Sequence, residues 1–419
     1  MIKRPKSLLT ALHKSHIKLH PTDVTKARVY IAEHWQKLQR ETPKDVDTLI
    51  GMPHPYLVPA YTEGNEFDFN ELYYWDSYFM AQGLLHDVHK DLLVGIVQNF
   101  ASLIDRFGII PNASRTYLMG RSQAPFFTSL IYDVYEAFGL EQKWLDKMIA
   151  AAEREYHEVW LGQAKPNHRQ VYEGLSRYYD INMLHDLAEA ESGWDMTPRF
   201  KRRALDYLPV DLNALLYKYE TDFARYYRDK GDKRTAGKWE NAANHRKETM
   251  DKLMWSSTKR LYYDYDYKKH RQSTVSSLAS FYPLWAGMVD DKRAKQLEKS
   301  LRKFQQKGGL SATDTYTLNQ RVPNGSIPAQ WAYPNGWAPL HFIVVQGLER
   351  YGFHREARDI AFRWIRTNLD WFREHGVFLE KYNVVQPLKP PVKGLYPTQV
   401  GFGWTNSIFE RFCQDYLDS

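Results

Sequence analysis

The chain has 419 residues, of which 43% are hydrophobic, and its 57 Lys and Arg against 50 Asp and Glu give a formal net charge of +7. This hydrophobic content excludes a disordered or fibrous chain, because it supplies enough apolar surface to bury a core. The single cysteine, Cys413, excludes a disulfide framework and any metal site built from several thiolates.

The first 22 residues carry five basic side chains and no acidic one. The apolar run among them is too short for a signal peptide, and no stretch of the chain approaches the roughly 20 apolar residues that cross a bilayer. We therefore expect a solvated basic arm over residues 1–22, a single domain over 23–419, and a cytoplasmic protein without membrane contact. Export without a signal, and contact of the arm with nucleic acid or anionic lipid, remain alternatives.

Apolar residues recur at three- and four-residue steps along most of the chain, which is typical of amphipathic helices. The clearest case runs from Asp91 to Phe107, where Gly108 ends the helix and Pro111 prevents its continuation. The same pattern predicts eleven further helices, near residues 24–40, 76–87, 125–138, 142–161, 211–229, 233–254, 275–287, 290–305, 338–351, 354–371 and 403–417.

These helices fall into antiparallel pairs separated by longer loops. Five pairs occupy residues 76–107, 125–161, 211–254, 275–305 and 338–371, and the first and last helices would form a sixth pair that closes the chain onto itself. Six hairpins in a ring make an all-α (α/α)6 toroid with an inner and an outer layer. An open solenoid is the competing architecture, but the sequence lacks the fixed 34- or 40-residue repeat that solenoids usually show.

Aromatic residues form 15% of the chain (13 Trp, 29 Tyr and 20 Phe), and the loops between the hairpins are rich in them. These loops repeat aromatic, amide and acidic side chains, in the segments 71–78, 111–125, 191–197, 330–339, 378–382 and 401–406. Trp and Tyr faces stack on the C–H faces of sugars, whereas amides, Arg and carboxylates bind hydroxyls. Core packing explains any single ring, but the repetition predicts a saccharide pocket.

Carboxyl groups in these loops are candidates for acid–base chemistry. Asp195 follows Trp194, and a carboxyl beside an indole loses solvation, which raises its pKa and suits a general acid. Glu380 is a second acid, remote in sequence, and glycoside hydrolysis needs two such acids brought together. Asp76 stands just before a predicted helix, where an N-cap role is the simpler interpretation.

Other chemistries leave no signature in the sequence. We find no His-Glu-x-x-His motif, phosphate-binding glycine loop, dinucleotide-binding fingerprint or nucleophile elbow. His185 and Glu189 have helical spacing for a metal pair, but a capping or surface role accounts for them. Stacking on single-stranded nucleic acid is an alternative for the aromatic loops, which however carry acids rather than Lys and Arg. We therefore expect no metal, no cofactor and no nucleic-acid partner, and a small saccharide as substrate.

Several loop motifs occur in the order found in the trehalases of glycoside hydrolase family 37: ELYYWDSYF, PNASRTY with RSQ, ESGWDM, QWAYPNGWAPL, EKYNV and GFGWTNS. The chain resembles this family over roughly residues 60–416. The resemblance implies an (α/α)6 barrel and an inverting mechanism, in which Asp195 is the general acid and Glu380 the general base. The candidate substrate-binding residues are Tyr74, Trp75, Asp76, Asn112, Arg121, Gln123, Gln330, Trp331, Asn335, Trp337, Phe402 and Trp404.

Four departures from the family pattern affect its sugar contacts. Asp68 lies in a segment where the family has a sugar-binding Arg, and Ala332 replaces the Asp of the family's Gln-Trp-Asp. The family's Arg-Pro-Glu-Ser segment has no match between Tyr179 and Glu191, and Leu395 stands where the family has a sugar-binding Glu. Losing one charged hydrogen bond to a buried hydroxyl costs about 1.5–3 kcal/mol. Hydrolysis of an α-glycosidic bond is therefore better supported than trehalose as the substrate.

Two alternatives follow from these departures. The toroid also resembles family 63 enzymes acting on glucosyl- or mannosylglycerate, and a charged aglycone would be compatible with Lys389 and Lys393. A sugar-binding protein that has lost turnover is the second alternative. Retention of both candidate carboxyls argues against it, because a binding protein has no need of the pair.

Overall fold

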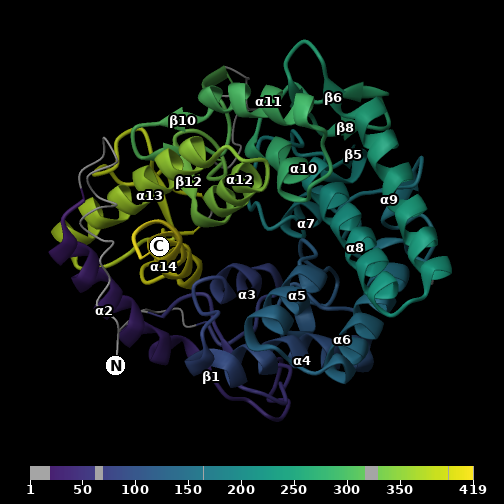
Figure 1. The fold of residues 1–419 in the computed structure, drawn as a ribbon, viewed down its shortest axis with the longest axis horizontal. Helices are drawn as coiled ribbons and strands as arrows, with labels where there is room; N and C mark the ends of the chain where they lie inside the picture. The colour runs from purple at the N-terminus through teal and green to yellow at the C-terminus, as the bar shows by residue number, and fades with distance from the viewer. Residues whose placement is uncertain (1–18, 62–68, 164, 317–328, 395, 419) are drawn as a thin grey trace.

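The helices form a closed ring with an inner and an outer layer (Figure 1). This computed structural model describes residues 19–61, 69–163, 165–316, 329–394 and 396–418. The inner helices are α3 (Tyr74–Ala81), α5 (Phe127–Phe138), α8 (Val210–Asp229), α10 (Tyr282–Trp285), α12 (Ala338–Arg350) and α14 (Gly403–Tyr416). Each inner helix contacts the next, and α14 contacts α3, so the inner ring is complete.

The outer layer covers this ring with one helix for each inner one. It consists of α2 (Pro21–Leu38), α4 (Lys90–Phe107), α6 (Gln142–Arg154), α9 (Lys233–Leu253), α11 (Asp291–Ser300) and α13 (His354–His375). All twelve predicted helices therefore have a counterpart among the described residues. The predicted arm falls mostly on residues 1–18, which lie outside the described residues, and α2 begins at Pro21 rather than after residue 22.

Three helical details differ from the sequence prediction. The segment expected over 142–161 continues past α6 as a π-helix, Glu155–Trp160. The helix expected over 275–287 is a 3-10 turn, Leu278–Phe281, followed by the short α10; Pro283 lacks the N–H that an α-helix would donate to residue 279. A short helix, α7 (His185–Ala190), was not predicted.

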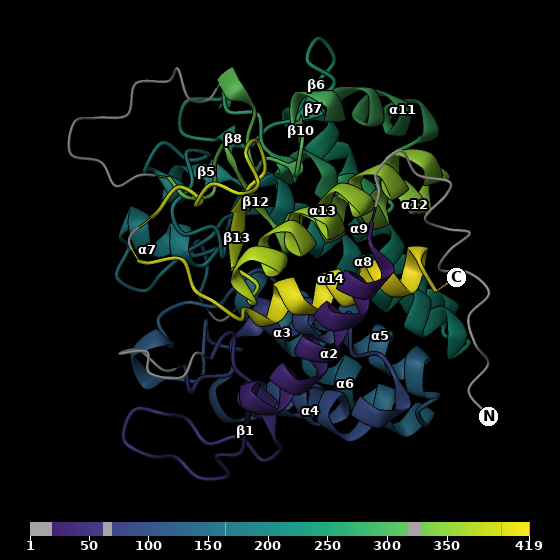
Figure 2. The same ribbon diagram turned by 90° about the vertical axis from the view of Figure 1, so that its left-hand side faces the viewer.

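Short antiparallel ribbons fill the loops between hairpins. They pair β1 (Gln39–Arg40) with β2 (Tyr56–Leu57), β3 (Gln170–Tyr172) with β4 (Leu175–Ser176), β6 (Trp255–Ser256) with β7 (Leu261–Tyr262), β10 (Gln305–Gln306) with β11 (Gly309–Leu310), and β12 (Asn335–Trp337) with β13 (Lys381–Asn383). A three-stranded ribbon has the order β5 (Tyr207–Leu208), β8 (Tyr265–Asp266), β9 (Arg271–Gln272). Figure 2 shows β5, β8, β12, β13 and α7 together at one end of the ring, with the C-terminal end of α14 at the other.

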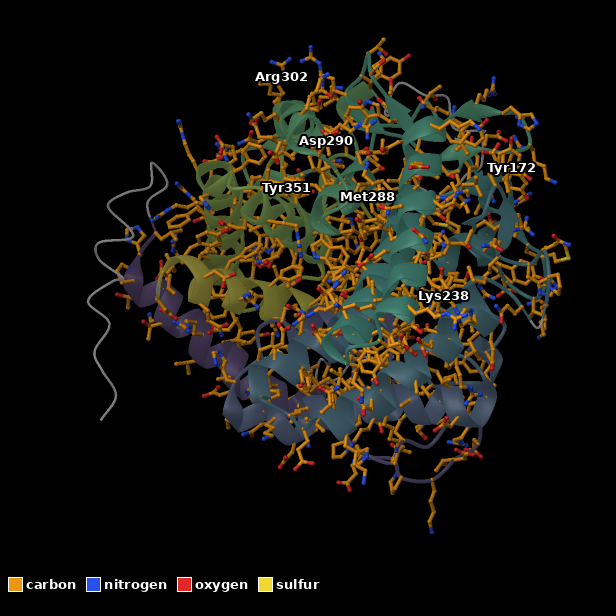
Figure 3. All side chains as sticks on the ribbon, turned by 45° about the vertical axis from the view of Figure 1, so that its right-hand side comes forward. Tyr172, Lys238, Met288, Asp290, Arg302 and Tyr351 are labelled. Atoms are coloured by element: carbon orange, nitrogen blue, oxygen red, sulfur yellow. The ribbon has the colours of Figure 1, made fainter. Side chains whose placement is uncertain are left out.

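Large apolar side chains fill the space within and between the layers, as Figure 3 shows around Met288, whereas Arg302 and Tyr172 lie at the periphery. The cysteine thiol of Cys413 is buried in this core and unpaired. Within the part of the chain that the structure describes, no helix has both the length and the apolar content that a membrane span requires.

Helix α2 closes the outer layer by packing against α13 and α14. Its Arg28 donates from Nε and Nη2 to the two carboxylate oxygens of Glu410, at 2.9 and 2.5 Å, and from Nη1 to Asp418 at 3.1 Å. Arg373 of α13 donates to Asp23 of α2 at 2.8 Å. The first and last helices are thus joined, as the sequence predicted, by charged side chains at their contact.

We expect Arg28→Ala to lower the free energy of unfolding by about 1 kcal/mol, because a bidentate hydrogen bond to Glu410 is stronger than a typical exposed ion pair. Chemical denaturation measures this change. The control is Arg154→Ala, whose pair with Asp105 is more exposed and whose loss should stay within about 0.5 kcal/mol. Equal losses in the two variants would show that Arg28 contributes nothing special to the closure.

Candidate active site

A cavity of about 460 Å³ opens among the loops of the ring, a size typical of small-molecule sites. It contains three carboxyl groups, from Asp76, Asp195 and Glu380, and is walled mainly by aromatic and proline side chains. Its lining comprises Pro59, Phe69, Tyr73, Trp75, Asp76, Gln123, Gly193, Asp195, Trp331, Glu380, Tyr396, Pro397, Gln399, Phe402 and Trp404. A larger groove, about 850 Å³, lies between α11 and α13 and has no aromatic lining residue, so the smaller cavity is the candidate site.

The beginnings of the inner helices deliver several of these groups. Trp75 and Asp76 lie in the first turn of α3, Phe402 is the N-cap of α14, and Trp404 follows in its first turn. Tyr73, not Asp76, is the N-cap residue of α3, and no side chain caps that helix. The simpler interpretation of Asp76 as an N-cap is therefore wrong, and its carboxyl lines the cavity instead.

Indole rings build the main wall in two layers. Trp331 lines the cavity and stacks on Trp337 with centroids 3.7 Å apart and planes 4° apart. Trp194 stacks on Trp331 at 5.3 Å, and Trp75 lies 5.6 Å from it. Trp331, Trp75 and Trp404 line the cavity. Trp194 and Trp337 do not line it and are fully buried, so they support the wall from behind.

The carboxyl of Asp195 occupies an environment that favours its protonated form. Its Oδ1 is shielded from solvent and has no hydrogen-bond partner among the described residues. Desolvation, with a further contribution from the charge of Glu380, raises the pKa of Asp195 to about 7, although Arg121 acts in the opposite direction. A carboxylic acid that keeps its proton near neutral pH is suited to donate it.

Glu380 has the opposite environment, because donors hold both of its carboxylate oxygens. Lys381 donates to Oε2 at 2.6 Å and the Tyr396 hydroxyl donates to Oε1 at 3.1 Å. The backbone of Glu380 is also fixed: Trp404 Nε1 donates to its carbonyl at 3.0 Å, and its N–H donates to Gln399. An ionised carboxylate is the form that these donors stabilise.

The third carboxyl, Asp76, is buried beside the other two. Desolvation, and then the charges of Asp195 and Glu380, raise the pKa of Asp76 well above its usual range. Ionising all three carboxyls in one cavity is unfavourable, because like charges repel each other. Of the three, Glu380 is the one that a cation among the described residues contacts directly.

A buried charge cluster supports the loop that carries Asp195. The Arg199 guanidinium is fully buried, donates to Asp211 and Asp264 at 2.7–3.0 Å, and lies 4.5 Å from the Trp194 ring. At the start of the same loop, Glu191 accepts the backbone N–H of Ser122 and of Tyr179. Both ends of the loop are therefore tied to buried partners.

The structure brings together Asp195, Glu380, Trp75, Asp76, Gln123, Trp331, Phe402 and Trp404 of the predicted site at the cavity. It places Tyr74 elsewhere, with its hydroxyl bonded to Glu155 and Tyr219 in the core. Arg121 pairs with Asp180, and the backbone N–H of Asn112 donates to the Arg121 carbonyl. Substrate contacts by these residues remain predictions.

The remaining predicted residues stand behind the wall. Asn335 donates to the carbonyls of Gln330 and Val392, the side-chain amide of Gln330 donates to the Asp195 carbonyl, and Trp337 is buried under Trp331. Ala332 is 7% exposed. Asp68 and Leu395, two of the departures from the family pattern, lie outside the described residues.

Sequence reasoning missed several residues of the site. Phe69, Tyr73, Tyr396 and Gln399 line the cavity, and Lys381 binds Glu380 from behind. The signals were present but unused: Lys381 is the second residue of the EKYNV motif, and Tyr396 matches the Tyr of the family's Gly-Glu-Tyr.

Among the described residues, no group of three His, Cys, Asp or Glu side chains is arranged to hold a metal ion. His185 accepts the backbone N–H of Leu205, and Glu189 accepts that of Thr197. These bonds give both residues of the possible metal pair a structural role.

Comparison with known proteins identifies relatives of the whole helical ring. The family model described as Trehalase matches residues 9–189 and 180–416. A cytosolic neutral trehalase of Beauveria bassiana (strain ARSEF 2860) is 34% identical over 87% of this chain and 58% of its own length. One from Kluyveromyces lactis is 33% identical over 87% of this chain and 56% of its own length. The chain thus spans little more than half the length of these curated relatives.

Solved structures give the same picture. Neutral trehalase from Saccharomyces cerevisiae superposes with a TM-score of 0.75 at 29% identity, covering 86% of this chain and 73% of that one. A GH63 mannosylglycerate hydrolase from Thermus thermophilus, in complex with glucose, has a TM-score of 0.66 at 17% identity over 91% of this chain and 99% of that one. The latter likeness concerns the fold alone, and together they confirm the predicted (α/α)6 toroid.

Gly193 is predicted to be irreplaceable because it combines a positive φ of 76° with close contact to the wall. An added Cβ would lie 2.4 Å from Cε2 of Trp75. We expect Gly193→Ala to lower the free energy of unfolding by about 1–3 kcal/mol for backbone strain and about 1–3 kcal/mol more for the clash.

The matched control is Gly352→Ala, since Gly352 has the same φ of 76° but no atom within 4 Å of the added Cβ. Denaturant unfolding of both variants separates the two costs. Equal losses would mean that Trp75 moves away without cost and that the close contact does not constrain the pocket.

Proposed function

Because the chain belongs to the trehalase family, we propose that it is an inverting glycoside hydrolase for a small α-glycoside, with trehalose, hydrolysed to two glucose molecules, as the first candidate. The observation that carries the proposal is the contrast between two carboxyls in one aromatic cavity. Asp195 is desolvated and has no partner at Oδ1, whereas Glu380 accepts bonds from Lys381 and Tyr396. This contrast divides the roles of acid and base.

In the proposed reaction Asp195 donates its proton to the glycosidic oxygen as the bond from that oxygen to the anomeric carbon breaks. Glu380 takes a proton from a water molecule, whose oxygen bonds to the anomeric carbon from the opposite face. The sugar leaves with inverted configuration, and the two carboxyls end with exchanged protonation states. Such a pathway requires carboxyls roughly 6.5–9.5 Å apart, with the water between them.

Other lining groups are suited to hold the sugar. The rings of Trp75 and Trp404 offer apolar surface to the C–H groups of a sugar, and a protonated Asp76 both donates and accepts hydrogen bonds. Gln123 uses its Oε1 to accept the Trp75 backbone N–H at 3.0 Å, which leaves its NH₂ group for a hydroxyl. Neither Lys389 nor Lys393 lines the cavity, so the geometry does not favour a charged aglycone.

We also propose a cytoplasmic location. The support is that both curated relatives carry the description cytosolic.

We expect Asp195→Asn and Glu380→Gln each to reduce kcat at least about 10³-fold, because each removes one proton transfer on which the reaction depends. The substrates to assay are trehalose, kojibiose, sucrose and α-glucosyl- and mannosylglycerate, with NMR of the anomer first released. Asp186→Asn, at a half-exposed carboxyl outside the cavity, is the control and should retain activity.

The results with these substrates distinguish between the candidate functions. Release of the inverted anomer from trehalose supports the proposal, whereas turnover of the charged glycosides alone would favour a family 63-like activity. Binding without turnover by the wild-type protein would favour a sugar-binding protein. Unchanged kcat in both carboxyl variants would overturn the assignment of acid and base.

The pKa of Asp195 also predicts a pH dependence. A general acid must hold its proton, so activity is present below the pKa and lost above it. With a pKa of about 7, kcat/KM should fall about tenfold per pH unit above neutrality. A pH profile from 5 to 9 measures the fall, and a profile that stays flat to pH 9 would contradict the role of Asp195.

A further inference from the structure

Lys381 is a fully buried cation in contact with the proposed base. Its side chain has 0% exposure, and its Nζ lies 2.6 Å from Glu380 Oε2. The other neighbours of Nζ are aromatic: it lies 4.9 Å from the Trp337 ring centre and 5.5 Å from that of Tyr396. Among the described residues, Glu380 is the one hydrogen-bond acceptor recorded for this ammonium group.

Lys381 does not touch the cavity. It belongs to β13, which pairs with β12 so that Lys381 stands opposite Trp337. Trp337 in turn supports Trp331, the indole that lines the cavity. The ammonium group therefore acts from behind the wall, on the carboxylate and not on the substrate.

Stability alone gives a poor account of this ion pair. Removing two charges from water costs several kcal/mol per ion, and well-packed apolar side chains often serve a core equally well. The ion pair stands in a site with two other carboxyls, where a charge has a specific use. A cation in direct contact favours the ionised form of the carboxyl that it touches.

Among the charged and titratable groups around Glu380, Lys381 is the cation that contacts it directly. Asp76 faces it from α3, Asp195 from the loop after α7, and Tyr396 from the segment before α14. Arg121 acts on Asp195 but is bonded to Asp180. Asp76 and Asp195 are carboxyl neighbours of Glu380 in the same cavity, whereas Lys381 is the cation in direct contact with it.

We propose that Lys381 is a positioning residue that keeps Glu380 ionised and aimed while Asp195 retains its proton, and so assigns the roles of base and acid. The inference rests on the proposed hydrolytic function. With Lys381 neutralised, three carboxyls would compete for protons without a cation in contact with any of them. Glu380 would then hold a proton at pH values at which it must accept one.

The test is the pH profile of Lys381→Met, which removes the charge and keeps a side chain of similar length. We expect the acid limb of kcat/KM to move up by about one pH unit or more, so activity at pH values below both limbs falls about tenfold or more relative to wild type. KM should change less than threefold, since Lys381 does not line the cavity. Lys381→Arg, which keeps the charge, should retain the wild-type acid limb.

Lys307→Met is the matched control, because Lys307 is exposed and remote from the cavity lining; its profile should not move. A loss of activity in Lys381→Met that is uniform across pH would indicate a merely structural role and would overturn the proposal.

A second measurement covers failure of Lys381→Met to fold, and it needs no turnover. Carboxyl-¹³C NMR of the wild-type protein, with Asp195→Asn and Glu380→Gln for assignment, follows both groups directly. We expect the Glu380 signal to report the ionised form throughout the range in which Asp195 titrates. If Glu380 instead held its proton to higher pH than Asp195, the role of Lys381 would be overturned. If Glu380 ionised first, as expected, but no substrate were hydrolysed, only the proposed reaction would be overturned.

Discussion

Closure of the inner helical ring is the constraint on which the rest of the structure depends. Gly83, just after α3, donates its backbone N–H to Ser407 Oγ of α14 at 2.7 Å, across a sequence separation of 324 residues. A side chain at Gly83 would collide with the Ser407 carbonyl at 2.5 Å. This approach brings Trp75 and Asp76 beside Glu380 and Trp404. The first and last parts of the chain therefore form one cavity only when the ring is closed.

Within the closed ring, burial and one ion pair create the electrostatics of the site. Desolvation acts on Asp76 and Asp195 alike and favours their neutral forms. Glu380 shares that interior but is bonded to Lys381. Similar carboxyls therefore acquire different chemistry from their neighbours rather than from their own nature. The wall of stacked indoles serves the same end, because it excludes water from the groups that it surrounds.

The sequence predicted the helices well because their signal is local: apolar spacing and breakers such as Gly108 and Pro111 act within one helix. It predicted the cavity in part, since motif loops identified Trp75, Trp331 and Trp404. The direction in which each side chain points was harder to predict. Tyr74 and Trp75 are neighbours, yet on a helix they point about 100° apart, and Tyr74 reaches Glu155 instead of the cavity. The Arg199 cluster joins Asp211 to Asp264, and no periodicity encodes such a contact.

The stacked pair of Trp331 and Trp337 has an optical consequence. Two parallel indoles with centroids 3.7 Å apart are close enough for their excited states to couple, and the coupling depends on the separation and relative orientation of the rings. Trp331 lines the cavity, and Trp337 lies 4.9 Å from the ammonium group of Lys381, so the pair has both in its surroundings. Binding of a ligand in the cavity, or loss of the charge on Lys381, would change the surroundings of this pair, so we expect tryptophan absorption and fluorescence to respond to both without any added label.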